Sequence, residues 1–158
     1  MKINLVNENF KSNYLENLLR SRGVDDIKQF INPPSMCLAD PADLDNINLG
    51  VQWLEETLAK PNSRILIIVD SDVDGYTSAA IVWNYIRAIA PNQDLNFILH
   101  EHKQHGLEDH IENLLNQNES FDLIILPDSS SNDFEHHEKL GSCGMRCLVL
   151  DHHDIDAD

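Results

Sequence analysis

Residues 64–85 read RILIIVDSDVDGYTSAAIVWNY and carry the clearest structural signal of the chain. The five apolar residues Ile65–Val69 are rich in β-branched side chains, which is typical of a strand buried on both faces of a parallel sheet. Three alternating carboxylates follow directly: Asp70, Asp72 and Asp74. Gly75 then breaks the pattern, and a helix-like sequence begins at Thr77. Open α/β sheets bind ligands at the carboxyl ends of their strands, so this acidic segment is expected to border a functional site.

The close spacing of these acids has an electrostatic consequence. Three carboxylates within a few residues repel one another unless positive charge lies between them. A pair of divalent metal ions is the simplest compensation, because hard cations take oxygen ligands. The segment therefore predicts a metal site at the end of this strand.

The rest of the chain alternates between strand and helix patterns. Strands are predicted at 65–69, 95–100, 122–126 and 146–150, and helices at 76–90, 107–117 and 132–140. Strands alternating with helices over short connections imply a parallel sheet with right-handed crossovers. The predicted fold class is α/β, a Rossmann-like parallel sheet flanked by helices.

A helical segment precedes the sheet. Helices are expected from about residue 11 to Gly23, over 24–31 and over 42–59. We interpret residues 1–61 as a helical preface packed on the core, and residues 62–158 as the sheet domain. Nothing in the preface indicates chemistry.

Composition sets the class of protein. The chain has 158 residues with 42% hydrophobic content, which fits a globular domain with a proper core. No apolar stretch approaches the roughly 20 residues of a membrane span, and the first residues lack a signal-peptide pattern. The cysteines Cys37, Cys143 and Cys147 are expected to be reduced and buried rather than paired or bound to zinc. The expected location is cytoplasmic.

The formal net charge of −16 argues against an ordinary nucleic-acid surface, because such a chain repels a phosphate backbone over most of its surface. A nucleic-acid enzyme stays compatible with this charge if metal ions neutralise its site and another part of the polypeptide supplies a basic groove.

Three strand ends carry the same kinds of residue. In a parallel sheet these ends share one edge, which would collect Asp70, Asp72, Asp74, Asp128, Asp151, His152 and His153. Oxygen ligands with one or two imidazoles suit manganese, magnesium or iron. Taken one at a time, these motifs also have a structural interpretation. Asp128 or Ser131 could cap the following helix, and the His152–His153 pair could lie on the surface.

The three strand-end motifs resemble a known family. DSDVDG at 70–75, PDSSSN at 127–132 and DHH at 151–153 are similar to the first three motifs of the DHH phosphoesterase superfamily. The helical preface, LRSRG at 19–23 and VDSDVDGYTSAA at 69–80 are most similar to RecJ-type exonucleases, particularly short RecJ-like phage proteins. The resemblance extends from about residue 10 onwards.

The resemblance implies a role for each residue of the three motifs. Asp72 and Asp74 would hold one metal each, Asp128 would bridge the two ions, and Asp70 would be an additional acidic ligand. His152 would be a metal ligand and His153 would contact the scissile phosphate. Asp151 would hydrogen-bond to an imidazole and fix its orientation without itself binding the metal. Two Mn²⁺ or Mg²⁺ ions would activate a water for in-line attack on the phosphodiester.

Other histidines and both tryptophans are weaker candidates. His105, before Gly106, and Asn132 are candidates for substrate binding, whereas the remaining histidines of the 100–110 segment are expected to be solvated. His136 and His137 are expected on a solvated helix face, and Trp53 and Trp83 are expected to pack in the core rather than stack on bases.

The predicted function is the amino-terminal catalytic half of a RecJ-like 5′-to-3′ single-stranded DNA exonuclease with a role in DNA repair or recombination. Residues 1–158 do not include the fourth motif and the second domain (DHHA1) of the family, so the chain is either a fragment of a longer enzyme or a naturally shortened relative, and these residues alone are expected to be weakly active or inactive. Expected partners are single-stranded DNA, through a basic half outside this chain, and replication or recombination proteins; no membrane is expected. Two alternatives stay open: a phosphodiesterase of short oligonucleotides or cyclic dinucleotides, and a non-catalytic module that binds a partner protein.

Overall fold

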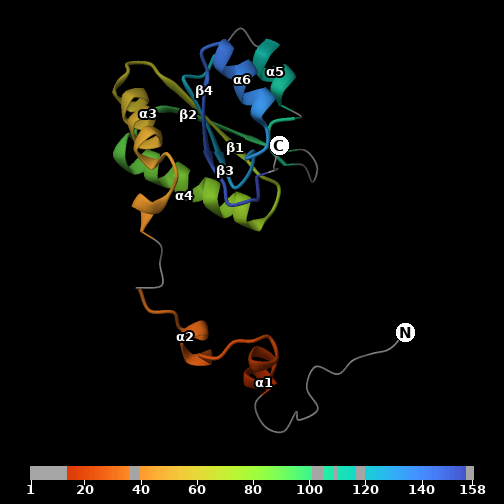
Figure 1. Cartoon of the computed structure of the whole chain (residues 1–158). Helices are drawn as coiled ribbons and strands as arrows, with labels where there is room; N and C mark the ends of the chain where they lie inside the picture. The colour runs from red at the N-terminus through yellow and green to blue at the C-terminus, as the bar shows by residue number, and fades with distance from the viewer. Residues whose placement is uncertain (1–13, 36–39, 101–104, 109, 117–119, 156–158) are drawn as a thin grey trace, which may run out of the picture. The chain divides into compact units, whose positions relative to one another are not determined.

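The computed structural model describes residues 14–35, 40–100, 105–108, 110–116 and 120–155. The chain divides into two compact units, Met1–Ile47 and Asn48–Asp158, and Figure 1 shows their elements. The second unit contains the sheet and every residue of the predicted metal site. Cys37 and His102 lie outside the described residues.

The sheet has four parallel strands in the described residues, β1 (Arg64–Val69), β2 (Asp94–Leu99), β3 (Leu123–Pro127) and β4 (Arg146–Leu150). Their order is β2-β1-β3-β4. In this register Ile67 lies beside Phe97 on one side and Ile125 on the other. β3 is buried along its length and β1 from Ile65 onwards, because both occupy inner positions. The predicted parallel α/β fold is confirmed.

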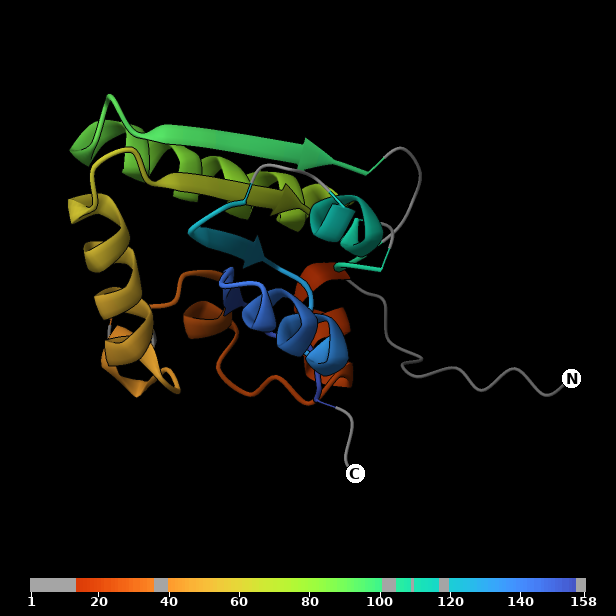
Figure 2. The ribbon, with the colours of Figure 1, turned by 90° about the horizontal axis from the view of Figure 1, so that it is seen from above.

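Helices cover both faces of the sheet (Figures 1 and 2). Alternate residues of β1 face opposite sides, so Leu66 and Ile68 join one apolar cluster and Ile65, Ile67 and Val69 join the other. The first cluster also takes side chains from α5 (Ile111–Asn116) and α6 (Phe134–Ser142), and the second from α3 (Ile47–Ala59) and α4 (Val73–Ile89). Burial of each such Ile or Leu contributes about 1.5–3 kcal/mol to the stability of the fold. This packing holds the strands in place, and with them the site residues at their ends.

The second cluster includes both tryptophans. Trp53 of α3 and Trp83 of α4 pack against it as partly buried residues, which confirms their predicted role in packing. α3 therefore belongs to the sheet unit by its contacts. The packing of the residues before α3 on this core stays a prediction.

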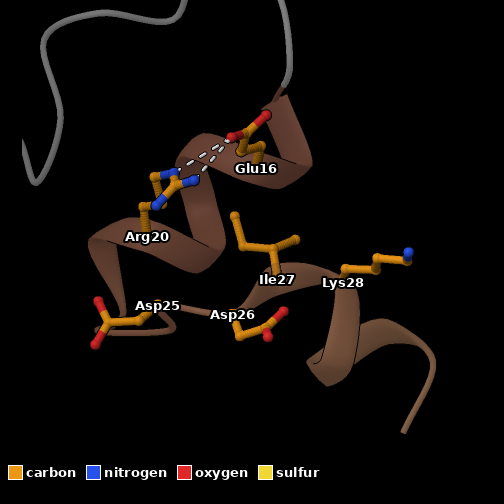
Figure 3. A pocket seen from close by; sticks show the side chains of 6 residues that line it. All are labelled: Glu16, Arg20, Asp25, Asp26, Ile27 and Lys28. Carbon is orange, nitrogen blue, oxygen red and sulfur yellow. Dashed lines mark hydrogen bonds and ion pairs between the residues drawn. The ribbon is translucent and has the colours of Figure 1, made fainter.

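The first unit contains α1 (Tyr14–Ser21), α2 (Ile27–Ile31) and the 3₁₀ helix η2 (Pro41–Asp43). A hollow of about 620 Å³ between α1 and α2 is lined by Glu16, Arg20, Asp25, Asp26, Ile27 and Lys28, and Figure 3 shows these side chains. Glu16 pairs with Arg20 at 3.1 Å, and Asp26 caps α2 by accepting from the Gln29 amide. These carboxylates have structural partners, so we assign no ligand to this hollow.

The cysteines differ in part from the prediction. Cys143 and Cys147 are both free, as predicted, and burial raises the pKa of the Cys147 thiol to about 11. The prediction of burial is wrong for Cys143, which is exposed because it follows the last turn of α6 at the surface. Within the described part of the chain, no helix has the length and apolar character that a membrane span requires.

Asp122 ties the amino end of β3 to β1. Its carboxylate accepts from the Arg64 amide at 2.8 Å and pairs with Lys60. Burial acts to raise the pKa of Asp122, but the Lys60 and Arg64 hydrogen bonds outweigh it and lower that pKa. Because the folded pKa is lowered, the stabilisation is present above the ordinary pKa of Asp, about 4, and is lost as the pH falls through the folded value.

We therefore expect Asp122→Asn to lower the free energy of unfolding by about 1 kcal/mol at neutral pH. The difference from wild type should shrink as the pH falls below about 4. Urea denaturation at several pH values measures both effects. Asp94→Asn is the matched control, because Asp94 is 52% exposed in its pair with Arg64 and should contribute little. Equal losses in the two variants would contradict the role of Asp122.

Candidate metal centre at the carboxyl edge of the sheet

Asp70 follows β1 directly and is almost completely buried, with 1% relative exposure. Its Oδ2 atom lies 2.7 Å from Nδ1 of His105. Its Oδ1 atom has no hydrogen-bond partner among the described residues. A buried carboxylate oxygen without a partner is costly, so this atom is suited to a ligand that the chain itself does not supply.

The next two acids sit at the start of α4, which begins at Val73, earlier than the predicted start at residue 76. Asp72 is the N-cap, because its Oδ1 atom accepts from the Gly75 amide at 3.1 Å. Asp74 lies in the first turn. Two hydrogen bonds lower the pKa of Asp72. The larger effect comes from the Gly75 amide and the smaller from the Asp74 side chain. The amino terminus of a helix favours negative charge, which allows the helix to begin inside the acidic segment.

Gly75 makes this junction sterically possible. A Cβ atom built at Gly75 would lie 2.5 Å from the Asp70 Cβ and 2.8 Å from the Asp70 carbonyl oxygen. Both distances are shorter than non-bonded atoms tolerate, so no residue with a side chain fits here without displacing the backbone. The first turn of α4 therefore rests directly on Asp70.

β3 ends in a turn with an unusual backbone. Asp128 and Ser130 have φ values of 69° and 81°, in the left-handed region that few residues with side chains adopt. Asp128 is 6% exposed and its Oδ2 atom has no hydrogen-bond partner among the described residues. Burial first, and then the charges of Asp74 and Asp72, raise the pKa of Asp128. The N-cap of the following helix is Asp133, so neither Asp128 nor Ser131 is a helix cap.

Asp151 follows β4 and forms hydrogen bonds with two segments, the turn after β3 and the loop after β4. One of its carboxylate oxygens, Oδ2, accepts from the Ser131 amide at 3.0 Å, and Oδ1 accepts from the His152 amide at 2.8 Å and lies 2.6 Å from Nδ1 of His153. Burial acts to raise the pKa of Asp151, but the hydrogen bonds from Ser131 and His153 hold it well below its usual range. The hydrogen bond between Asp151 and His153 also raises the pKa of His153.

The two neighbouring histidines differ in their contacts. His152 directs Nε2 to Asp128 Oδ1 at 3.1 Å, whereas the Nδ1 atom of His153 is held by Asp151. The rings lie 4.7 Å apart between centroids. The Nδ2 atom of Asn132 donates to the Asp154 carbonyl at 3.1 Å, which places this candidate at the rim formed by the same loops.

These strand ends bring donor atoms together in three groups among the described residues. Within each group the donor atoms lie within 4.8 Å of one another, and the groups are Asp70–Asp72–His105, Asp72–Asp74–Asp128 and Asp128–His152–His153. Asp72 and Asp128 each belong to two groups, so the three form one continuous set. A cavity of about 500 Å³ adjoins this set and is lined by His105, Gly106, residues 128–133, Asp151, His153 and Asp154.

Several histidines differ from the prediction that they are solvated. His100 is buried at 9% exposure, with Nδ1 3.1 Å from Nε2 of His110. His136 and His137 are partly buried, and burial lowers the pKa of His137. His100 follows β2, and His136 and His137 lie on α6, each facing the interior at least in part. The sequence around them is mostly polar, so it does not indicate which side faces inward.

Sequence reasoning missed Asp133. Its Oδ2 atom accepts from the Leu107 amide at 2.9 Å, and its side chain makes no cap hydrogen bond to its own helix. Asp133 falls inside the helix predicted at 132–140, and no pattern in the sequence relates it to Leu107.

Residues 64–158 match the DHH family, N-terminal domain. The chain belongs to the DHH family. Two curated relatives, both called YorK, come from Bacillus subtilis (strain 168) and Bacillus phage SPbeta, and are named as candidate single-strand DNA-specific exonucleases. Each is 34% identical over 157 residues, which is 99% of this chain and 26% of the relative. The chain thus spans about a quarter of the length of these relatives.

A solved structure shows the same fold. The crystal structure of RecJ in complex with Mn²⁺ from Thermus thermophilus superposes with a TM-score of 0.62 at 23% identity. The match covers 89% of this chain and 19% of that protein. The DHH fold predicted from the strand-end motifs is therefore confirmed.

The Gly75 contact can be tested with a matched pair of glycines in helices. Gly75→Ala should destabilise the DHH domain by about 1–3 kcal/mol, because the new methyl group overpacks against Asp70. Gly141→Ala should be neutral or stabilise by up to about 1 kcal/mol, since nothing lies within 4 Å of its built Cβ in α6. Chemical denaturation of both variants measures the difference. Similar effects of the two changes would contradict the close approach of α4 to Asp70.

Proposed function

We propose that this chain forms the metal-binding part of a phosphodiesterase active site that cleaves single-stranded DNA from an end. One observation carries the proposal: carboxylates from the ends of β1 and β3 converge with histidines that follow β2 and β4. Two of the carboxylates, Asp70 and Asp128, bury oxygens without a hydrogen-bond partner in the described residues. If this edge of the sheet had only a structural role, such buried oxygens would be unfavourable, because each loses its hydration without gaining a hydrogen bond.

The donor set fits a hard or intermediate divalent cation. Carboxylate oxygens dominate and imidazole nitrogens complete it, which suits Mn²⁺ or Mg²⁺. We assign metal binding to Asp70, Asp72, Asp74, Asp128 and His152. Two ions bound there would lower the pKa of water and polarise a phosphoryl oxygen. The Mn²⁺ bound in the RecJ crystal structure supports this choice.

His153 is suited to the phosphate rather than to the metal. Its Nδ1 atom is held by Asp151 at 2.6 Å, and that contact raises the pKa of His153 and favours the cationic ring. A cationic imidazole donates to a phosphate oxygen, and the contact strengthens as negative charge builds up in the transition state. Asp151 is then a positioning residue that fixes the ring.

The names of the two YorK relatives support single-stranded DNA as the substrate class. The net charge of −16 means that this chain by itself repels a phosphate backbone outside the metal site. We therefore propose that basic groups outside these residues bind the DNA strand. A non-catalytic module that binds a protein is less favoured, since it would not require the convergent acids.

Metal binding should stabilise the folded chain. At a Mn²⁺ concentration 100 times its dissociation constant the gain is about 2.7 kcal/mol, or several degrees in melting temperature, relative to protein in chelator. Asp128→Asn should lose most of this gain. Asparagine is the appropriate replacement, because the φ of 69° at this position disfavours alanine. Differential scanning calorimetry measures the shift.

Asp94→Asn controls for the loss of one negative charge far from the site, and its Mn²⁺ response should equal that of wild type. A full Mn²⁺ response in Asp128→Asn would show that Asp128 is not a ligand. The absence of any response in the wild-type chain would contradict the metal site as a whole.

His152 and His153 should affect cleavage in different ways. With protein in excess over a labelled single-stranded oligonucleotide, so that slow cleavage is visible, both alanine variants should lower the rate by about tenfold or more. Excess Mn²⁺ should restore part of the rate of His152→Ala, because that change weakens metal affinity. It should not restore His153→Ala, whose loss is a phosphate contact. Rescue of His153→Ala alone would reverse the two assignments, and unchanged rates in both would remove the DHH segment from the site.

A further inference from the structure

Two Asp–His pairs lie at the carboxyl edge of the sheet. Asp151 holds His153 at 2.6 Å beside β4, and Asp70 holds His105 at 2.7 Å beside β1. A carboxylate only accepts hydrogen bonds, so without a metal ion Nδ1 of His105 donates to Asp70. When a divalent cation binds beside Asp70, the ring proton can move to Nε2, which frees the Nδ1 lone pair of His105 for the ion.

The segment that carries His105 is fixed to the neighbouring loop. Asp133 accepts from the Leu107 amide at 2.9 Å, and Leu107 is fully buried. Gly106 has a φ of 72°, and a Cβ built there would lie 2.4 Å from the Asp133 Oδ2 atom. The backbone at Gly106 thus lies directly against Asp133, which fixes the backbone next to His105.

The donor atoms of Asp70, Asp72 and His105 lie within 4.8 Å of one another, close enough to share one ion. Asp70 contributes an oxygen, Oδ1, without a partner among the described residues, at 1% exposure. We propose that His105 is a metal ligand that completes a position with Asp70 and Asp72, and that Asp133 positions it. This inference rests on the proposed function of the edge and replaces the predicted role of His105 in binding substrate.

A nitrogen donor at this position has a chemical consequence. Imidazole binds first-row transition metals well, whereas Mg²⁺ prefers oxygen ligands throughout. His105 should therefore increase the preference of the site for Mn²⁺ over Mg²⁺. A residue that touched only the substrate phosphate would not change this preference in the absence of DNA.

The test is metal binding by the whole 158-residue chain without substrate. Isothermal titration with Mn²⁺ and with Mg²⁺ should show that His105→Ala raises the Mn²⁺ dissociation constant about tenfold or more, and the Mg²⁺ constant by less. His105→Gln should give the same result while keeping a donor to Asp70, which separates metal loss from misfolding. Asp133→Asn should give a smaller rise, because it loosens the loop and leaves the imidazole in place.

Electron spin-echo measurements on bound Mn²⁺ give a second readout. In a chain lacking both His152 and His153, a nitrogen signal from imidazole should persist and should disappear when His105→Ala is added. Asp94→Asn is the charge control, and Asp128→Asn is the reference for a lost ligand.

The outcomes separate this inference from the proposed function. If Asp128→Asn weakens Mn²⁺ binding and the His105 variants do not, His105 is not a ligand and the metal site stands without it. If the wild-type chain binds no Mn²⁺, the proposed function fails together with the inference.

Discussion

The mutual repulsion of carboxylates at one edge of the sheet is the constraint on which the site depends. Donor atoms of Asp72, Asp74 and Asp128 lie within 4.8 Å of one another, and burial together with the charges of Asp74 and Asp72 raises the pKa of Asp128. Asp70 adds a further acid at 1% exposure. The fold holds these charges together through the α4 cap, the Gly75 contact and the turn after β3, none of which supplies a positive charge. A divalent cation bound there, as we propose, would reduce the repulsion and would be coordinated by the unpartnered oxygens.

The position of each strand in the sheet explains which kind of ligand it delivers. The inner strands β1 and β3 are followed by Asp70 and Asp128, which are buried because neighbouring strand ends cover them on both sides. The imidazoles come after the outer strands: His105 after β2, and His152 with its neighbour after β4. Buried carboxylates thus lie at the centre of the edge, and more exposed rings lie at its flanks.

The sequence was sufficient for the sheet and for the convergence of its acids, since apolar runs and strand ends are properties of local pattern. It misplaced the start of α4, because an acid that follows a strand can also be the N-cap of the next helix, as Asp72 is. It assigned solvated positions to His100 and His137 and missed Asp133, whose partner Leu107 is distant in sequence. Contacts between loops depend on how the helices pack, and no periodicity records them.

The turn after β3 depends on the DHH segment for its conformation. Left-handed conformations such as those of Asp128 and Ser130 cost about 1–3 kcal/mol each and persist only where surrounding contacts impose them. The Asp128 amide donates to the Leu150 carbonyl at 2.9 Å, and Asp151 accepts from the Ser131 amide at 3.0 Å. The end of β4 therefore holds the turn in the conformation that directs Asp128 to the edge. Asp151 thereby holds the backbone next to Asp128 and the ring of His153 at the same time, so its loss would disturb two separate parts of the edge.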